Sequence, residues 1–205
     1  MVEPSAVTAC IVAGGRARRL GGVLKPLLIV DGETIVDRQR AVLAPRVGEL
    51  VIALARETPS QAPLAGLGMR AVYDVAPAAG PLAGIAAGFA ASARPWLLVV
   101  AGDMPHLQPA VIDALLAAAA DGADAVVPRV NGYPEPLCAL YGRRAAAVID
   151  ARLAAGDRRT QGILDDLRVT WLDEPHVRTL DPDLLTFTNV NHAPGAVPPP
   201  HRRSR

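Results

Sequence analysis

Lysine is nearly absent from this sequence. Lys25 is the single lysine among 21 basic residues, and the other 20 are arginines. This bias suggests that arginine replaces lysine wherever either side chain will serve. Lysine is a compact point charge on a thin stem, whereas arginine is a broad planar fork. We therefore expect the remaining lysine at a position where arginine cannot replace it. Chance survival is the alternative, and the glycine-rich segment around Lys25 argues against it.

Cysteine is scarce too, and no excess of one charge is present. Cys10 and Cys138 lie far apart without a C-x-x-C pair, which argues against a disulfide framework or a cysteine zinc site and suits a reducing compartment. The 21 basic and 20 acidic residues give a formal net charge of +1. Proteins that bind nucleic acid or membrane surfaces usually have a larger basic excess, so we expect neither partner.

We also expect neither a targeting segment nor a membrane-spanning segment. The first four residues contain no basic side chain ahead of the apolar run, unlike a secretory signal. Residues 75–93 are uncharged, but proline, glycine and alanine dominate them. A spanning helix needs stronger apolar residues and an unbroken backbone, so we expect a loop and a closely packed helix here. Together with the cysteine usage, this predicts a cytoplasmic protein.

The 205 residues, 51% of them hydrophobic, suit one sizeable domain. Continuous apolar runs alternate with helical segments, which predicts a mostly parallel, Rossmann-like sheet covered on both faces, a single-domain three-layer α/β/α fold. We assign this domain to residues 1–193 and expect the Pro- and Arg-rich residues 194–205 to form a disordered tail. The expected strands are Val7–Ala13, Leu27–Val30, Leu50–Leu54, Met69–Tyr73, Trp96–Ala101, Ala125–Val127 and Pro136–Tyr141, with Leu164–Leu172 and Thr186–Val190 completing the fold. The expected helices are Thr34–Leu43, Gly80–Ala91, Pro109–Ala120 and Arg144–Ala155, and Thr58–Leu67 is expected to form a short helix and a loop.

Three polar segments follow three of these strands. They are residues 14–25, Asp74 and Asp103. Because ligands of open α/β sheets bind at the carboxyl ends of the strands, we expect the three segments to meet at one site.

The segment 14–25 is rich in both glycine and positive charge. It holds four glycines and four cations in twelve residues. Glycine permits the turns that direct backbone N–H groups into a concavity, and such a nest with flanking cations suits a polyphosphate. The spacing matches neither the P-loop nor G-x-G-x-x-G. An ordinary surface loop is the alternative, although four cations would repel one another there without an anion.

Asp103 and a pair of asparagines are further candidates. A carboxylate at a strand end, near bound phosphates, is a usual seat for Mg²⁺; the alternative is that Asp103 caps the helix after Pro105. Asn189 and Asn191 would face the same side of a strand and could serve one polar ligand. Turn hydrogen bonds at a sheet edge are an equal alternative for these two amides.

An ordered set of motifs resembles the molybdenum cofactor guanylyltransferases, which belong to the nucleotidyltransferase superfamily. The resemblance spans about residues 7–191 and implies the nucleotidyltransferase form of the α/β fold. Its motifs are Val12-Ala13-Gly14-Gly15, Arg18-Arg19-Leu20-Gly21-Gly22 with Lys25, Asp74 with residues 80–85, Gly102-Asp103-Met104-Pro105, residues 136–141, Gly156-Asp157-Arg158-Arg159 and Thr188-Asn189-Val190-Asn191.

The resemblance implies an Mg²⁺-dependent enzyme that transfers GMP from GTP to molybdopterin and releases pyrophosphate. It places Val12, Ala13 and Gly14 at the nucleotide, together with Asp74. It places Gly15 in the loop around the phosphates. Proteins that deliver the cofactor or mature molybdoenzymes would be its further partners.

The same resemblance implies the catalytic residues. Lys25 would contact phosphates, with Arg19 lining the same loop, and Asp103 would hold the metal as well as the nucleotide. Asn189 and Asn191 would lie toward the pterin.

Two alternatives stay open. Leu24 and Ala53 stand where many family members have Asp and Asn, so a cytidylyltransferase or another nucleotidyltransferase of the superfamily remains possible. A non-catalytic nucleotide-binding maturation factor is the third reading. Lys25 and Asp103 argue against it, because a binding module needs neither a metal carboxylate nor a lysine in place of arginine.

Overall fold

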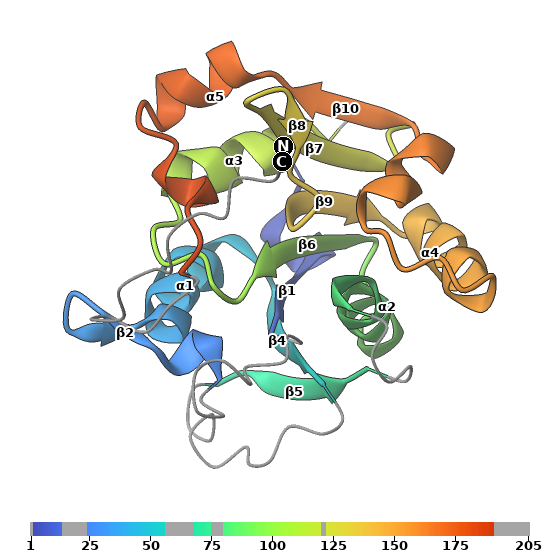
Figure 1. The fold of residues 1–205 in the computed structure, drawn as a ribbon, viewed down its shortest axis with the longest axis horizontal. Coiled ribbons are helices and arrows are strands. Elements are labelled where there is room, and N and C mark those ends of the chain that lie inside the picture. Colours follow the sequence, from blue (N-terminus) through green and yellow to red (C-terminus); the bar gives the residue numbers. More distant parts are fainter. Residues whose placement is uncertain (1, 14–23, 56–67, 75–79, 120–121, 191–205) are drawn as a thin grey trace, which may run out of the picture.

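The centre of the molecule is an eight-stranded sheet. The computed structural model describes residues 2–13, 24–55, 68–74, 80–119 and 122–190. The strand order is β10-β7-β9-β6-β1-β4-β5, with β8 paired to β7 (Figure 1). The strands are β1 (Val7–Val12), β4 (Glu49–Leu54), β5 (Arg70–Tyr73), β6 (Trp96–Ala101), β7 (Ala125–Val130), β8 (Tyr133–Pro134), β9 (Cys138–Gly142) and β10 (Val169–Leu172).

The sheet is mostly parallel, as predicted. β1 lies parallel to β4 on one side and to β6 on the other. β5 and β10 are parallel to their neighbours, whereas β9 is antiparallel to β6 and β7. The pairing of Val12 with both Ala53 and Ala101 brings three carboxyl ends to one edge of the sheet.

Helices cover both faces of this sheet. Figure 1 shows α1, α3 and α5 on one face and α2 and α4 on the other, so the predicted three-layer fold is confirmed. The helices are α1 (Ile35–Leu43), α2 (Pro81–Ala91), α3 (Pro109–Ala117), α4 (Arg144–Ala154) and α5 (Glu174–Leu180), and the short 3-10 helices include η3 (Lys25–Leu27), η6 (Gln161–Asp166) and η7 (Leu185–Phe187).

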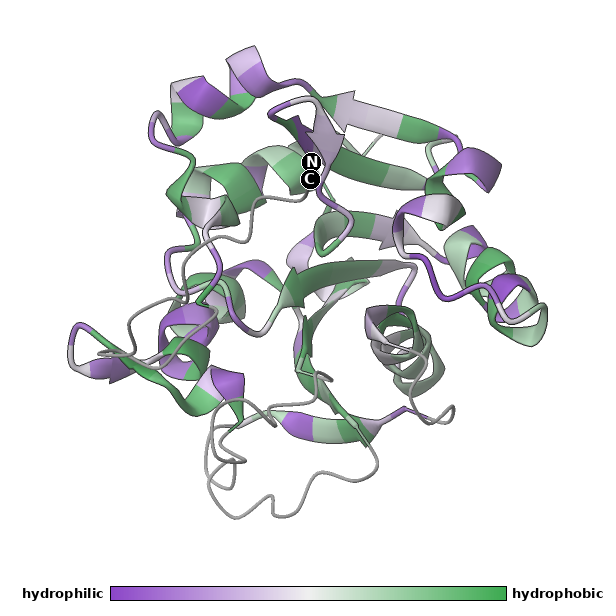
Figure 2. Cartoon of the chain, in the orientation of Figure 1, coloured by the Kyte–Doolittle hydropathy of each residue, from purple (hydrophilic) through white to green (hydrophobic). Residues whose placement is uncertain are grey.

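The central strands are apolar on both faces. Every residue of β1 is buried, and so is every residue of β6 after Trp96. Figure 2 shows β1, β4 and β6 in hydrophobic colours, while α5 at the outer surface is largely hydrophilic. Burial on both faces explains why these strands are continuous apolar runs rather than alternating ones.

A short hairpin connects η3 to α1. β2 (Ile29–Val30) pairs antiparallel with β3 (Glu33–Thr34) across a turn whose Asp31 and Gly32 have φ angles of 51° and 86°. Thr34 caps α1, since its Oγ1 accepts a hydrogen bond from the Asp37 backbone N–H at 3.2 Å. The backbone N–H of Ile35 also donates to the Leu28 carbonyl at 3.0 Å, which ties α1 to the end of η3.

α2 packs very close to the sheet because of its small residues. A Cβ added at Gly84 would lie 2.8 Å from Val12 Cγ1, and one at Gly88 would lie 2.7 Å from Cys10 Sγ. Neither contact is tolerable without a shift of the helix or of β1. This close approach brings Pro81, the first residue of α2, to the edge where β1 and β6 end.

Some sequence predictions differ from the structure. The last predicted strand, Thr186–Val190, is wrong, because η7 covers part of it and residues 188–190 have no regular structure. α5 and β8 were not predicted. The predicted helix at Thr58–Leu67 and the predicted tail at 194–205 lie outside the described residues. Among the helices that the structure describes, none combines the length and apolar character needed to cross a membrane.

Candidate active site

Lys25 and Asp103 meet at the carboxyl edge of the sheet. Lys25 Nζ lies 2.7 Å from Asp103 Oδ2, in an ion pair whose side chains are 31% and 19% exposed. Lys25 comes from η3, and Asp103 comes from the turn after β6, so 77 residues of chain separate the two charges. The predicted convergence of these two segments is confirmed.

The ion pair lines a cavity of about 210 Å³. Residues from β1, η3, α2, β6 and the segment before β9 form its walls. They are Val12, Ala13, Lys25, Pro26, Pro81, Ala101, Gly102, Asp103 and Leu137. The predicted nucleotide residues Val12 and Ala13 therefore share one cavity with the predicted catalytic pair.

Gly102 permits the close approach that this cavity requires. Its backbone N–H donates to the Val12 carbonyl at 2.9 Å. A Cβ at Gly102 would lie 2.8 Å from Pro26 Cγ and 3.3 Å from the Val12 carbonyl oxygen. Glycine at this position therefore allows the turn of Asp103 to lie directly against the loop that carries Lys25.

The turn of Asp103 is also held from α1 and from the C-terminal segment. Gln39 Nε2 donates to the carbonyls of Ala101 and Met104 at 2.8 and 2.9 Å. The backbone N–H of Val190 donates to the Asp103 carbonyl at 2.9 Å. Sequence reasoning missed Gln39, although its spacing from the buried residues Ile35 and Leu43 places it on the core face of α1.

The alternative role of Asp103 as a helix cap is wrong. α3 begins at Pro109, and its N-cap residue is Gln108. The Asp103 carboxylate is directed to Lys25 instead. This leaves Asp103 available for a ligand at the strand edge.

The remaining predicted residues lie in different places. Asp74 is buried at the end of β5, and its backbone N–H donates to the Leu54 carbonyl at 3.1 Å, but it does not line the cavity of the ion pair. Asn189 is exposed and adjoins Val190, so it lies near the Asp103 turn. Its segment is not a strand, and the strand argument for pairing it with Asn191 is therefore wrong. Gly14, Gly15, Arg19 and Asn191 lie outside the described residues.

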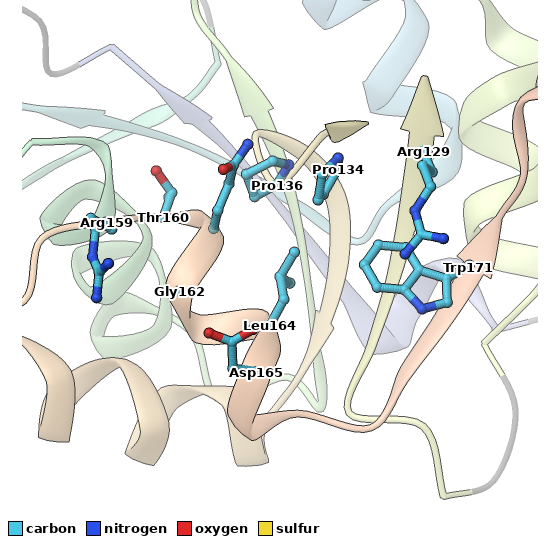
Figure 3. A pocket seen from close by; sticks show the side chains of 10 residues that line it. Arg129, Pro134, Pro136, Arg159, Thr160, Gly162, Leu164, Asp165 and Trp171 are labelled. Carbon is cyan, nitrogen blue, oxygen red and sulfur yellow. The ribbon is translucent and has the colours of Figure 1, made fainter. Parts of the chain in front are cut away.

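A second cavity, of about 680 Å³, is larger than the first. Pro136 lines the larger cavity and the next residue, Leu137, lines the smaller one. Residues from β7, β8, η6 and β10 form its other walls (Figure 3). Its lining consists of Arg129, Pro134, Pro136, Arg159, Thr160, Gln161, Gly162, Leu164, Asp165 and Trp171.

Cations and an aromatic ring characterise this larger cavity. The Arg129 guanidinium lies 4.1 Å above the centroid of the Trp171 ring, at one end of the cavity in Figure 3. Arg159 stands at the other end, with its Nε 3.0 Å from Asp157 Oδ1. The Arg159 guanidinium, bonded to Asp157, holds the pKa of that carboxyl well below its usual range. Among these residues, sequence reasoning had singled out only the segment of Asp157 and Arg159.

Glu135 is a partly buried acid that precedes the lining residues Pro136 and Leu137 in the sequence. It immediately precedes Pro136, and its backbone N–H donates to the Pro128 carbonyl at 2.9 Å. Burial raises the pKa of the Glu135 carboxyl above its usual value, because burial penalises the charged form.

Comparison with known proteins gives the family of this chain. The model of the MobA-like NTP transferase domain matches residues 9–171. The chain belongs to this family. As a MobA-like nucleotidyltransferase, it is 36% identical to the molybdenum cofactor guanylyltransferase of Desulfosudis oleivorans, over 91% of this chain and 90% of that protein. It is 34% identical to a probable molybdenum cofactor guanylyltransferase of Methanosarcina acetivorans, over 90% and 85% of the two chains.

A solved structure supports the same family. The molybdopterin-guanine dinucleotide biosynthesis protein A of Archaeoglobus fulgidus superposes on this MobA-like chain with a TM-score of 0.75 at 26% identity. The match covers 90% of this chain and 92% of that one. The resemblance found in the sequence motifs is therefore confirmed, and so is the nucleotidyltransferase form of the fold.

Proposed function

We propose that this protein transfers GMP from GTP to molybdopterin, giving the guanine dinucleotide form of the cofactor and pyrophosphate. The observation that carries the proposal is the Lys25–Asp103 ion pair, 2.7 Å long, within the cavity at the carboxyl edge of the sheet. This edge is where ligands of open α/β sheets bind. The names of the curated relatives, molybdenum cofactor guanylyltransferase, support the choice of donor and acceptor.

The smaller cavity is our candidate for the reacting end of the nucleotide. Lys25 offers an ammonium group that is partly exposed in this cavity. In the proposed reaction it neutralises phosphate charge and holds the α-phosphoryl group for attack. Contacts of this kind act by positioning and by charge stabilisation, without a covalent intermediate.

Asp103 is our candidate ligand for Mg²⁺. The donor set fits this ion, because Mg²⁺ is usually held by one or two carboxylates together with substrate phosphates. The described residues contain no group of three or more His, Cys, Asp or Glu side chains placed to hold a metal by themselves. When bound, Mg²⁺ would neutralise charge that develops on the leaving pyrophosphate.

The larger cavity is our candidate for the acceptor. Its lining includes Pro136, and the next residue along the chain, Leu137, lines the smaller cavity, which supports a second substrate close to the first. Trp171 and the Arg129 guanidinium stacked on it are candidates for contact with a flat heterocycle, and the Arg129 and Arg159 charges suit an anionic substrate. The exposed Asn189, beside the Asp103 turn, stays a candidate for the pterin side.

The proposed acceptor needs no general base. The second pKa of a phosphate monoester is about 6, so the terminal phosphate of the acceptor is mostly dianionic at neutral pH. It can attack the α-phosphorus of GTP directly, and pyrophosphate leaves without prior protonation. The task left to the protein is alignment of the two substrates and neutralisation of their crowded negative charge.

Titration calorimetry with GTP and with CTP, each with Mg²⁺, tests the proposal first. We expect tighter binding of GTP, followed by turnover when molybdopterin is added. Tighter binding of CTP would assign the protein to cytidylyl transfer with the same candidate residues. Binding of either nucleotide without any turnover would favour the maturation factor.

A further inference from the structure

A buried glutamine faces the Asp103 turn from α1. Gln39 is completely buried, and its two hydrogen bonds to the Ala101 and Met104 carbonyls use both hydrogens of its amide group. The Met104 backbone N–H also donates to the Ala101 carbonyl, at 3.3 Å. Gly102 and Asp103 are thus the central residues of a four-residue turn whose two outer carbonyls are fixed by one side chain.

Apart from the turn, the described residues around Gln39 are mostly apolar and offer no partner for an amide group. Its helix neighbours Val36 and Leu43 are completely buried, as are most residues of the apolar cluster that they join. The other amide atom, Gln39 Oε1, is buried without a hydrogen-bond partner. An unsatisfied buried acceptor is destabilising, and an apolar side chain of similar size avoids that cost. The two bonds to the turn are what distinguish glutamine from such a side chain here.

The turn needs external bonds because it contains a glycine. Gly102 cannot be replaced by a larger residue without a clash with Pro26, and glycine has the widest conformational range of all residues. Hydrogen bonds to the carbonyls on both sides of Gly102–Asp103 remove that freedom. They fix the direction in which the Asp103 carboxylate leaves the backbone.

The same helix also holds the loop of the partner charge. The Ile35 backbone N–H, at the start of α1, donates to the carbonyl of Leu28. Leu28 directly follows η3, whose first residue is Lys25. Arg38 Nε donates to the Pro105 carbonyl at 3.1 Å, just beyond the Asp103 turn. α1 is therefore bonded both to the segment that carries Lys25 and to the segment that carries Asp103.

We infer that Gln39 is a positioning residue for Asp103. Its amide fixes the turn so that the Asp103 carboxylate meets both Lys25 and a metal–nucleotide complex. The inference rests on the proposed function, in which Asp103 is the metal carboxylate. Gln39 itself touches neither substrate nor metal.

Gln39→Met tests the inference, because methionine has similar size and lacks the N–H donors. We expect the melting temperature to fall only slightly, because the Met104 carbonyl loses its donor while the unpartnered Gln39 oxygen is removed as well. We expect kcat to fall at least tenfold and the affinity for Mn²⁺ in the presence of GTP, measured by electron paramagnetic resonance, to fall several-fold. Affinity for GTP without metal should stay unchanged, which a general loss of structure would not produce.

Thr8→Val is the matched control. Thr8 is equally buried, and its hydroxyl bonds Ser92 Oγ at 2.7 Å near the opposite end of β1. This variant should lose stability while its Mn²⁺ affinity stays at the wild-type value. Gln39→Glu is the second variant, because its buried acid can donate at most one of the two hydrogen bonds, and we expect an intermediate Mn²⁺ affinity.

Two results separate failure of the inference from failure of the proposed function. Wild-type kcat and Mn²⁺ affinity in both Gln39 variants would overturn the positioning role, provided that Asp103→Asn weakens Mn²⁺ binding. If Asp103→Asn itself binds Mn²⁺ with GTP as the wild type does, the proposed metal role of Asp103 is wrong. A kcat that falls only in proportion to lost stability, as in Thr8→Val, would make Gln39 a packing residue.

Discussion

The two cavities differ in how they are built. The smaller one is formed by the ends of central parallel strands and the turns that follow them, with one cation and one carboxylate in direct contact. The larger one is formed by β7, β8, η6 and β10 toward the side of the sheet, and its lining combines two arginines, one acid, a tryptophan and several polar and apolar residues. The comparison suggests that the core of the sheet supports the chemistry, whereas the outer strands determine what reacts.

Asp103→Asn should have the largest effect. It removes the carboxylate charge at the smaller cavity while keeping the size of the side chain. Loss of metal-ion stabilisation is worth several kcal/mol, so we expect kcat to fall about 1000-fold. Initial rates over a range of Mg²⁺ concentrations measure this fall. Thermal stability should change little, because a partly exposed ion pair contributes about 0–1 kcal/mol; extensive unfolding would point to a structural role instead.

Lys25→Ala should come next. Loss of one positioned donor to a developing negative charge lowers kcat by about 100-fold. Single-turnover rates, with the acceptor at saturation, measure this loss apart from binding. Lys25→Arg is the informative companion, because a broad planar guanidinium does not reproduce the compact ammonium that lies 2.7 Å from Asp103. Full activity in the arginine variant would contradict the significance given to the single lysine.

Trp171→Leu should affect the acceptor alone. Loss of the ring face removes about 1–2 kcal/mol of stacking, which corresponds to a rise of roughly tenfold in KM for the acceptor. The affinity for GTP, measured by calorimetry, should not change. Trp96→Leu is the control, since Trp96 begins β6 and lines neither cavity. Equal effects of Trp171→Leu on both substrates would break the division between the two cavities.

Asp124→Asn should have the smallest effect on turnover and a measurable effect on stability. Asp124 accepts hydrogen bonds from the Arg168 guanidinium and backbone N–H at 3.0–3.1 Å, which ties the start of β7 to the start of β10. These bonds lower the pKa of its carboxyl to about 2. A hydrogen bond to a charged group contributes about 1.5–3 kcal/mol, so the variant should be less stable by about that amount at pH 7.

The pH dependence of that difference has a definite direction. The folded-state pKa of Asp124 lies below its usual value of 3.8, so its stabilisation is complete above that usual value. It is lost as the pH falls from 3.8 through about 2. Denaturant melts of both proteins between pH 7 and pH 2 should therefore converge at the acid end. A constant difference would assign the effect to packing.

The central half of the fold was predictable from sequence because it depends on short, continuous patterns. Strands buried on both faces are unbroken apolar runs, and β6 has the predicted bounds. Parallel strands bring their carboxyl ends to one edge, so the meeting of Lys25 and Asp103 also followed from the pattern.

The outer half depends on contacts that no local pattern contains. Arg129 and Trp171 stack because β7 and β10 pair in parallel, with Trp171 opposite Val127 in the register. The strand expected around Asn189 is wrong, although the neighbouring residues are compatible with one. The segment is held instead by a backbone hydrogen bond to the Asp103 carbonyl. The spacing of Gln39 places it on the core face of its helix, but only the folded structure shows that its amide contacts the Ala101 and Met104 carbonyls.

The separate linings of the two cavities have a consequence for protein engineering. Pro136 and Leu137 are consecutive residues that line different cavities, and the two linings have no residue in common. A directed-evolution library confined to Arg129, residues 159–165 and Trp171 would diversify one surface while leaving the Lys25–Asp103 pair intact. New acceptors could then be selected on a scaffold whose nucleotide chemistry is inherited unchanged.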